Sequence, residues 1–392
     1  MRGSVVASWS GFLVAGVVVV GGTITSGEPV PMLDGMVTRA GDFVYVSGVV
    51  GNVPGSSDLR EGIAAQVHQA IQNVRTTLQA EGLDLSDVVS SNVYLSDTRN
   101  FQAMNEVYRT YFSDDPPTRA TVEADLPDAG ALVQLTMVAT RPELGRRVIT
   151  PSAMQSPGLP YSWGVMAGNT LFIAGATSRD PSTYEPVTGD VTTQTRRVMQ
   201  NIGHVLEAAG MAYGDVVGCK VFLADGRDFR AMNQAYSSFL PTPRPVRATV
   251  RTRLMNPVFK VEVQCFAVKD PDNPRTVPGG GPGSTGSLSP ALQVGDRLFL
   301  SGMLGRGSDG YAAGDFEAQT RQTLQNISGA LESGGMNFDN VVDVAVWITD
   351  IRQATRVGNI VREALPDRPV TIVAAGLMST AGLVEIQMTA EK

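Results

Sequence analysis

The segment Gly41-Asp-Phe-Val-Tyr-Val-Ser-Gly48 recurs twice further along the chain, as Gly168-Asn-Thr-Leu-Phe-Ile-Ala-Gly175 and Gly295-Asp-Arg-Leu-Phe-Leu-Ser-Gly302. Each copy begins 127 residues after the previous one. The pattern is typical of a tight turn followed by a short buried strand that ends in glycine. A fixed period over a chain of 392 residues predicts three tandem copies of one domain.

A second block follows each strand. It holds Gln, Asn and Gly at matching positions, with apolar residues at helical spacing between them, and we interpret the Asn as a helix-to-loop hydrogen-bonding group. The three sets are Gln66, Asn73 and Gly82; Gln194, Asn201 and Gly210; and Gln319, Asn326 and Gly335. The glycine is a natural C-terminal stop for the predicted helix.

A strand that ends in Asp97, Asp225 or Asp350 comes next. A second helix then carries Phe-x-x-Met-Asn-x-x-Tyr at 101–108 and 229–236, whereas the third copy keeps the length but not these residues. A proline-rich turn and two strands close each copy. The unit is therefore predicted to be α+β, a mixed sheet with two helices on one face.

The domain boundaries follow from these blocks and from composition. We predict domains at 23–146, 147–270 and 287–392, with a Pro/Gly-rich linker at 271–286. Residues 1–22 are almost entirely apolar or small, with no charge between Arg2 and Glu28. This leader favours an exported or membrane-anchored protein over a cytoplasmic one, the alternative being the first strand of the fold.

Composition excludes several classes of function. The net charge is −7 and no block of Lys or Arg interrupts it, so nucleic acid is not an expected partner. Cys219 and Cys265 cannot supply a disulfide framework or zinc spacing. His68 and His204 lie in helical patterns, which disfavours a Ser-His-Asp triad. No P-loop or dinucleotide motif is present, so neither a cofactor nor a metal is expected.

These blocks resemble the Rid family (YjgF type) of enamine/imine deaminases. The resembling motifs are a GPYSQ-like segment, the [SA]G strand end, NxxY on the second helix, PxR-x-x-V and a final VEIE-like strand. Members of that family form homotrimers with ligand clefts between subunits. The resemblance implies that this chain is an intramolecular pseudo-trimer, monomeric in solution, with three non-equivalent clefts. A sheet covered by helices on one face leaves another apolar face to bury, which suits this arrangement.

The chemistry implied by the resemblance is hydrolysis of 2-imino acids, or of their enamine tautomers, to 2-oxo acids and ammonia. The expected partner is thus a small carboxylate-bearing imine or enamine, or a 2-oxo acid. The family's carboxylate-binding arginine maps onto Arg119 and Arg247, with Thr371 in the third copy. The VEIE-type glutamate, an acid/base or water-positioning group, maps onto Glu262 and Glu385, with Gln134 in the first copy.

The remaining motif residues are unevenly kept. The tyrosine of the GPYSQ-like segment, which the resemblance makes a catalytic candidate beside the two glutamates, survives as Tyr161, with Asp34 and Leu288 in the other copies. The resemblance also implies substrate contacts from the [SA]G residue, from the helix-two Asn and from the residue two after the arginine. These are Ser47, Ser301, Asn105, Asn233, Thr121 and Thr249.

Three other interpretations compete with a deaminase. Because motif residues are missing from some copies, the clefts could bind a small acid without turnover. A three-repeat amidohydrolase of the cyanuric-acid or barbiturate type would need a repeated lysine, and Lys220, Lys260, Lys269 and Lys392 do not repeat. A ribonuclease would need a basic groove with aromatic residues, which this sequence lacks. One or two clefts that retain a ligand site are the expectation.

Overall fold

The computed structural model describes residues 36–278, 286–312 and 314–392. The predicted leader at 1–22, Asp34 and the glycine run at 279–283 lie outside these residues. All of the described residues belong to one compact unit, so contacts between its repeats can be described.

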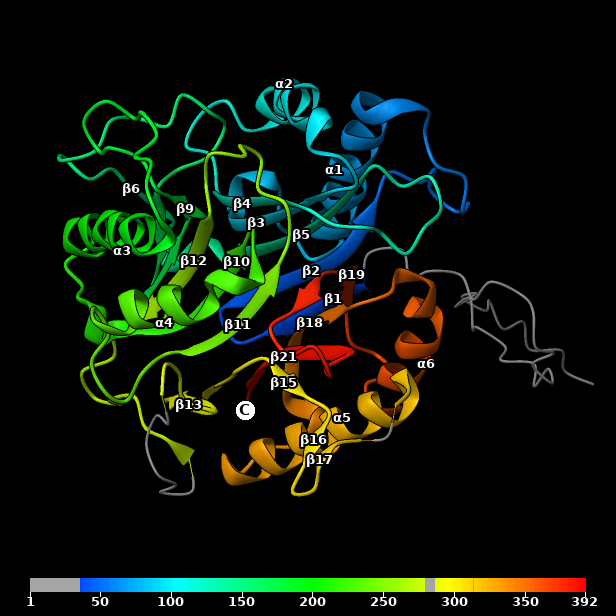
Figure 1. The fold of residues 1–392 in the computed structure, drawn as a ribbon. Helices are drawn as coiled ribbons and strands as arrows, with labels where there is room; N and C mark the ends of the chain where they lie inside the picture. Colours follow the sequence, from blue (N-terminus) through cyan, green and yellow to red (C-terminus); the bar gives the residue numbers. More distant parts are fainter. Residues whose placement is uncertain (1–35, 279–285, 313) are drawn as a thin grey trace, which may run out of the picture. The chain divides into compact units, whose positions relative to one another are not determined.

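The first repeat follows the order predicted from the sequence (Figure 1). Its strands and helices are β1 (Met36–Ala40), β2 (Phe43–Val50), α1 (Gly62–Ala80), β3 (Val88–Leu95), α2 (Phe101–Tyr111), β4 (Thr118–Glu123) and β5 (Val133–Thr140).

The second repeat has the same order, with its first strands broken into shorter pieces. Its elements are β6 (Arg147–Ile149), β7 (Gly164–Ala167), β8 (Thr170–Ile173), β9 (Ala176–Thr177), α3 (Val191–Ala208), β10 (Val216–Leu223), α4 (Phe229–Ser237), β11 (Val246–Arg251) and β12 (Val261–Val268).

The third repeat adds a short hairpin before its first helix. Its elements are β13 (Ala291–Val294), β14 (Arg297–Leu300), β15 (Met303–Leu304), β16 (Arg306–Gly307), β17 (Gly310–Tyr311), α5 (Phe316–Ser333), β18 (Val341–Ile348), α6 (Ala354–Ala364), β19 (Val370–Ala374), β20 (Gly376–Leu377) and β21 (Val384–Glu391).

Each repeat is built on one mixed sheet, as expected. The order in the first repeat is β1-β2-β5-β3-β4, and the third repeats it as β13-β14-β21-β18-β19. The strand before and the strand after the second helix pair in parallel, β3 with β4, β10 with β11 and β18 with β19, while the other pairs are antiparallel. The α2, α4 or α6 crossover is what makes that parallel pairing possible. The predicted α+β unit is confirmed.

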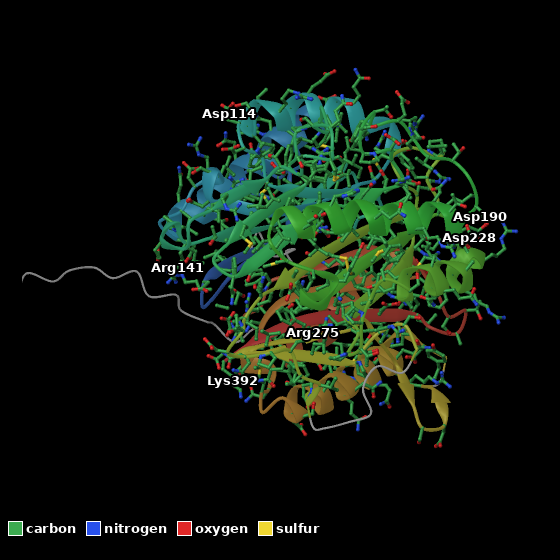
Figure 2. All side chains as sticks on the ribbon, turned by 90° about the vertical axis from the view of Figure 1, so that its left-hand side faces the viewer. Asp114, Arg141, Asp190, Asp228, Arg275 and Lys392 are labelled. Atoms are coloured by element: carbon green, nitrogen blue, oxygen red, sulfur yellow. A yellow bond between two sulfur atoms is a disulfide. The ribbon has the colours of Figure 1, made fainter. Side chains whose placement is uncertain are left out.

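Each repeat buries its own core between sheet and helices. In the first repeat, Val67, Ile71, Val74 and Leu78 of α1 pack with residues of β2 and β5 such as Val46. The helical spacing identified in the sequence is therefore the face that α1 buries. Charged side chains such as Asp114, Arg141 and Asp190 are exposed at the outside of the chain (Figure 2).

A separate apolar cluster joins the three repeats. Tyr94 of β3, Phe222 of β10 and Trp347 of β18 occupy matching strand positions, and each is at most 2% exposed. Strand residues alternate between faces, so these side chains lie opposite those that pack against the helices. The sheet faces that the helices leave uncovered are thus buried against other repeats.

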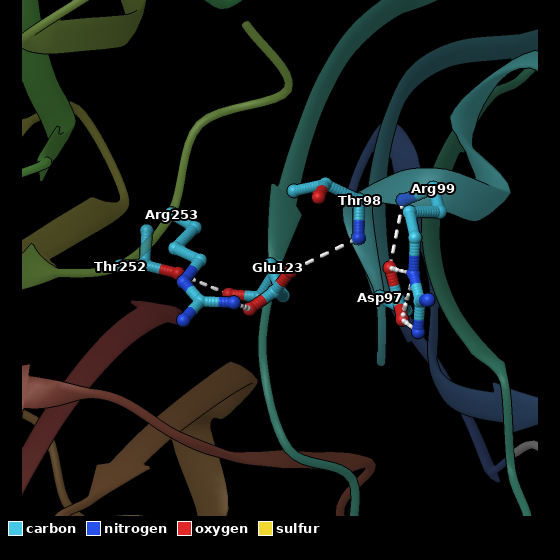
Figure 3. Close-up of polar contacts among 6 residues, drawn as sticks. All are labelled: Asp97, Thr98, Arg99, Glu123, Thr252 and Arg253. Atoms are coloured by element: carbon cyan, nitrogen blue, oxygen red, sulfur yellow. Dashed lines mark hydrogen bonds and ion pairs between the residues drawn. The ribbon is translucent and has the colours of Figure 1, made fainter. Parts of the chain in front are cut away.

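Backbone and side-chain contacts also join the repeats at their strand edges. Glu123, which ends β4, accepts a hydrogen bond from the backbone N–H of Thr98 and forms an ion pair with Arg253 of the second repeat at 3.2 Å (Figure 3). Val250 and Arg251 of β11 pair with β20 of the third repeat. The Ala374 N–H donates to the Asp125 carbonyl at 3.0 Å, so the third repeat contacts the first.

The strands predicted to end in aspartate end earlier than expected. β3 stops at Leu95, and the Asp97 side chain accepts from the Arg99 N–H to cap a short 3-10 helix. Asp225 and Asp350 cap the equivalent turns. A side-chain oxygen that satisfies a free N–H at a helix start explains why aspartate recurs at this position.

The two cysteines form a disulfide within the second repeat, a pairing that was not predicted from the sequence. Cys219 on β10 lies opposite Cys265 on β12, and both are buried. A single cross-link is not a disulfide framework, but it does close a loop across 46 residues.

Reduction of this disulfide is expected to lower the free energy of unfolding by about 2–4 kcal/mol, because the open chain gains conformational entropy when unfolded. Denaturant titration with and without a reductant measures this. A Cys219→Ala/Cys265→Ala chain is the control, since the reductant should leave its midpoint unchanged. An unchanged midpoint in the wild-type chain would contradict the prediction.

In the part of the chain that the structure describes, no helix combines the length and the apolar character needed to cross a membrane.

Candidate functional site

A cleft of about 490 Å³ lies between the first and second repeats and is called the first cleft. Arg119 and Thr121 of β4 line it from one side. Tyr161 and Glu262 of the second repeat line it from the other. Four residues that the sequence assigned to a site are thereby brought together from two repeats.

Arg119 is buried in the first cleft, at 4% exposure. Its Nη2 donates to Asn105 Oδ1 of α2 at 2.6 Å, and its guanidinium carbon lies 4.9 Å from the centre of the Tyr108 ring. Among the described residues, no carboxylate lies within ion-pair distance of it. Burial lowers the pKa of Arg119, yet a guanidinium remains charged in proteins. A buried cation without an anionic partner suits an anionic ligand.

Glu262 supplies the only ionisable carboxyl group among the described residues that line the first cleft. Burial raises the pKa of Glu262 to about 8, although a hydrogen bond from the Thr121 backbone and the charge of Arg119 both act to lower it. The carboxyl group is thus largely protonated at neutral pH and can donate a proton.

The glycine of the [SA]G strand end makes room for this carboxyl group. A Cβ on Gly175 would lie 2.0 Å from Glu262 Oε1, and one on Gly302 would lie 2.0 Å from Glu385 Oε1. Any side chain at these positions would displace the glutamate, so the repeated glycine has a steric reason.

Hydroxyl groups complete the lining of the first cleft. Thr121 is 6% exposed, and its Oγ1 has no hydrogen-bond partner among the residues described. The Tyr161 hydroxyl lies 2.8 Å from the hydroxyl of Tyr184. Burial raises the pKa of Tyr161 well above its usual value, so this phenol stays protonated. Thr121 is therefore available to bind a ligand or a water molecule.

A second site repeats this arrangement between the second and third repeats. Arg247 is 2% exposed, and its Nε and Nη1 have no partner among the described residues. The Thr249 N–H donates to Glu385 Oε1 at 3.3 Å, and burial raises the pKa of Glu385 to about 7. Ser301 Oγ accepts from the Arg247 N–H at 2.9 Å and donates to the Ser289 carbonyl, so its role here is structural.

The second site differs from the first in how complete its contacts are. Asn233 Oδ1 has no partner within the described residues, whereas Asn105 Oδ1 bonds its arginine. Thr249 Oγ1, by contrast, matches Thr121 of the first cleft, since both are buried without a partner in that part of the chain. Leu288 replaces the tyrosine of the first cleft.

The junction between the third and first repeats lacks both charged groups. Thr371, which stands where the arginine is expected, bonds Thr136 of the first repeat through the two Oγ1 atoms at 2.7 Å. Gln134 replaces the glutamate, and its Oε1 is buried without a partner among the described residues. Ser47 Oγ is also buried and unpaired within that set. The two losses therefore fall in one junction and leave two sites with both arginine and glutamate.

The profile of the family described as Endoribonuclease L-PSP matches three segments of the chain, residues 34–141, 152–269 and 280–392. The chain belongs to this family. The resemblance to Rid proteins of the YjgF type is thereby confirmed.

Members of this family with curated names match one repeat at a time. A RutC family protein of Pyrococcus horikoshii is 38% identical over 125 residues, which are 32% of this chain and 99% of that protein. The human 2-iminobutanoate/2-iminopropanoate deaminase is 33% identical over 128 residues, which are 32% of this chain and 92% of that protein. The family description refers to an endoribonuclease, whereas the name of the human relative refers to a deaminase.

A solved structure also matches one repeat. The YjgF gene product of E. coli is 32% identical, with 32% of this chain and 99% of that one covered and a TM-score of 0.29.

The hydrogen bonds expected from the repeated helix asparagines are confirmed. Asn73 donates to the Asn52 carbonyl at 3.0 Å, Asn201 to the Arg179 carbonyl at 2.9 Å, and Asn326 to the Arg306 carbonyl at 3.0 Å. Each bond fixes the loop that follows the [SA]G strand. His68 and His204 lie on α1 and α3, as predicted, and neither lines the first cleft.

The lining of the first cleft includes residues that were not predicted from the sequence, and two of them bear on its chemistry. Arg179 and Tyr184 come from the loop between β9 and α3. The sequence did hold a signal for them, because an arginine and a tyrosine recur one repeat period later, as Arg306 and Tyr311. The family motifs lie at other positions and so did not point to this pair. No group of three or more His, Cys, Asp or Glu side chains is placed to hold a metal ion within the described ranges.

Proposed function

We propose that this chain hydrolyses 2-imino acids, or their enamine tautomers, to 2-oxo acids and ammonia in the first cleft. The proposal is supported by two groups that line one cleft of small-molecule size. Arg119 is buried there with no carboxylate of the described residues within ion-pair distance, and the Glu262 carboxyl group is largely protonated at neutral pH. The second site, with Arg247 and Glu385, has the same groups and is proposed to do the same chemistry.

The binding step follows from the arginine. The Arg119 guanidinium donates parallel hydrogen bonds to the substrate carboxylate, and Asn105 fixes its orientation. This places the imine carbon and nitrogen between Arg119 and Glu262. Burial strengthens the contact because little water competes for the charge.

The chemical steps follow from the glutamate. The Glu262 carboxyl group donates its proton to the imine nitrogen, which makes the carbon more electrophilic. The resulting carboxylate takes a proton from a water molecule as that water attacks the carbon, with Thr121 Oγ1 as a hydrogen-bonding partner for the water. The tetrahedral carbinolamine then loses ammonia and leaves the 2-oxo acid, so one water is consumed for each imine.

The test is an assay of imine lifetime with the full chain. An amino-acid oxidase generates the 2-imino acid in solution, and semicarbazide traps what remains. Faster loss of imine with the chain present supports the proposal. A folded chain that binds 2-oxo acids but accelerates no imine would instead indicate a binding protein on the same fold.

We propose in addition that the three repeats of one chain take the place of three subunits. The shared apolar cluster around Tyr94, Phe222 and Trp347 and the edge contacts between the repeats support this.

We accordingly expect a monomer in solution, because those surfaces are already covered within one chain. Sedimentation equilibrium should return the chain mass of 41.5 kDa at all concentrations. A species of about three times that mass would contradict this prediction.

A further inference from the structure

Arg179 places a second guanidinium in the first cleft, on the same lining as Arg119 and Glu262. Its guanidinium carbon lies 4.2 Å from the centre of the Tyr184 ring and 4.8 Å from that of Phe259. Its Nη1 donates to the Tyr184 carbonyl at 2.8 Å. As with Arg119, no described carboxylate forms an ion pair with it.

The loop that carries Arg179 contains a residue in an unfavourable backbone conformation. Tyr184 has φ = 64°, a left-handed value that is unusual for a large side chain. Such a residue persists only where its surroundings determine it, and these cluster at functional sites. Here the Tyr184 hydroxyl contacts that of Tyr161, and Asp180 accepts from the backbone N–H groups of Ser182 and Thr183. The Asn201 bond to the Arg179 carbonyl completes the support.

An arginine at the position of Arg179 is present only in the repeats that face an anchoring arginine, Arg119 or Arg247. The third repeat, which faces Arg247, has Arg306 and Tyr311 at the matching positions. The guanidinium carbon of Arg306 lies 6.0 Å from the centre of the Tyr311 ring. The first repeat, which faces Thr371, has Asn52 there and Ser57 five residues on. A purely structural arginine would have no reason to be absent only where the anchor is absent.

Charge balance then defines the ligand. The first cleft holds two guanidinium groups, and the carboxyl group of Glu262 is their only acidic neighbour among the described residues of its lining. Because that group is largely protonated at neutral pH, a ligand with one carboxylate leaves one cation uncompensated. Phe101, Met255 and Pro257 supply apolar contact for a short carbon chain.

We infer that the first cleft selects dianionic 2-imino acids, those whose side chain ends in a second carboxylate, with Arg119 on the C1 carboxylate and Arg179 on the distal one. The inference rests on the proposed function for the reaction, but the selectivity for two carboxylates is a property of binding and is tested separately.

The test compares two 2-oxo acids of equal chain length, 2-oxoglutarate and 2-oxopentanoate, as probes of binding. Titration calorimetry uses the full chain with Arg247→Met. This change removes the anchoring arginine of the second site and leaves Arg119 of the first cleft as the remaining one. We expect 2-oxoglutarate to bind at least about tenfold more tightly. Arg179→Met should abolish that preference by weakening 2-oxoglutarate alone, and Arg179→Lys should retain part of it.

The matched control is Arg196→Met, an exposed arginine on α3 of the same repeat, which should leave the preference intact. Equal affinity for the two probes, a preference that survives Arg179→Met, or no binding of either probe by the folded chain would overturn the inference. Imine hydrolysis without any preference for a second carboxylate would sink the inference and leave the function standing. A 2-oxoglutarate preference without turnover would do the reverse.

Discussion

Arg119→Met is expected to lower kcat/KM for imine hydrolysis in the first cleft by roughly 30-fold or more. The guanidinium is buried beside Asn105 and the Tyr108 ring, and no carboxylate of the described residues lies within ion-pair distance of it, so the substrate carboxylate is its expected counter-ion. Removing one partner of a buried charged contact costs about 2–5 kcal/mol. That range corresponds to a fall in kcat/KM of roughly 30-fold to several thousandfold. Methionine keeps a long apolar stem and limits the cavity left behind.

The measurement must separate the two sites, since Arg247 and Glu385 form the second. Imine hydrolysis is compared in the wild-type chain, in each single Met variant and in the Arg119→Met/Arg247→Met chain, which should be inactive. Thr371→Val is the matched control, because it alters the equivalent position at the junction that has neither arginine nor glutamate. Activity retained in the double variant, or lost in Thr371→Val while folding is intact, would remove the arginines from the mechanism.

The fold could be predicted from the sequence because its signals are local and repeated. The turn-strand segment at 41–48 and the apolar spacing of Val67, Ile71 and Val74 depend on neighbours a few residues away. Three copies of each pattern pointed to the mixed sheet and the two helices of a repeat, and these are observed. The role of Asn73 and its equivalents followed from the same reasoning.

The composition of each site could not be predicted in the same way, because it depends on which repeat lies against which. Arg119 and Glu262 are far apart in sequence, and only packing shows that Arg119 meets Glu262 while Thr371 meets the first repeat. The disulfide between Cys219 and Cys265 likewise depends on the register of β10 against β12. Arg179 requires a loop conformation with positive φ at Tyr184 that no motif signals.

The placement of the losses suits a fused chain. In a trimer of identical subunits, a change of arginine to threonine would affect every cleft. In this chain Thr371 replaces the arginine and Gln134 the glutamate at one junction, where Thr371 bonds Thr136 instead of a charged group. Burying an unpaired charge is costly, so an unused junction gains stability when both ionisable groups are lost.

Glu262→Gln is expected to lower the rate of hydrolysis in the first cleft by roughly 100-fold to 10,000-fold, which is the usual contribution of a positioned acid or base. An amide of nearly the same shape cannot donate the proton. Because burial raises the pKa of Glu262 to about 8, the acid form predominates at neutral pH. In the Arg247→Met chain, kcat/KM, which reports the ionisation of the free enzyme, should therefore fall as pH rises through about 8. A rate that rises across this range would show that the carboxylate, not the acid, is the working form.

The same substitution should stabilise the ligand-free fold at high pH. The pKa of Glu262 is raised from 4.5 in the unfolded chain to about 8 in the folded one, so between these values the folded state binds more protons. The wild-type chain thus loses stability as pH rises from about 4.5 to 8, whereas the contributions of all other ionisable groups are common to both chains. Glu262→Gln should match the wild type near pH 4.5 and exceed it near pH 9, by an amount on the order of a few kcal/mol. Denaturant titrations of the two chains at both pH values measure the difference. A gap that does not change with pH would mean that the carboxyl group ionises as freely in the fold as in water, and the proton donor would have to be sought elsewhere.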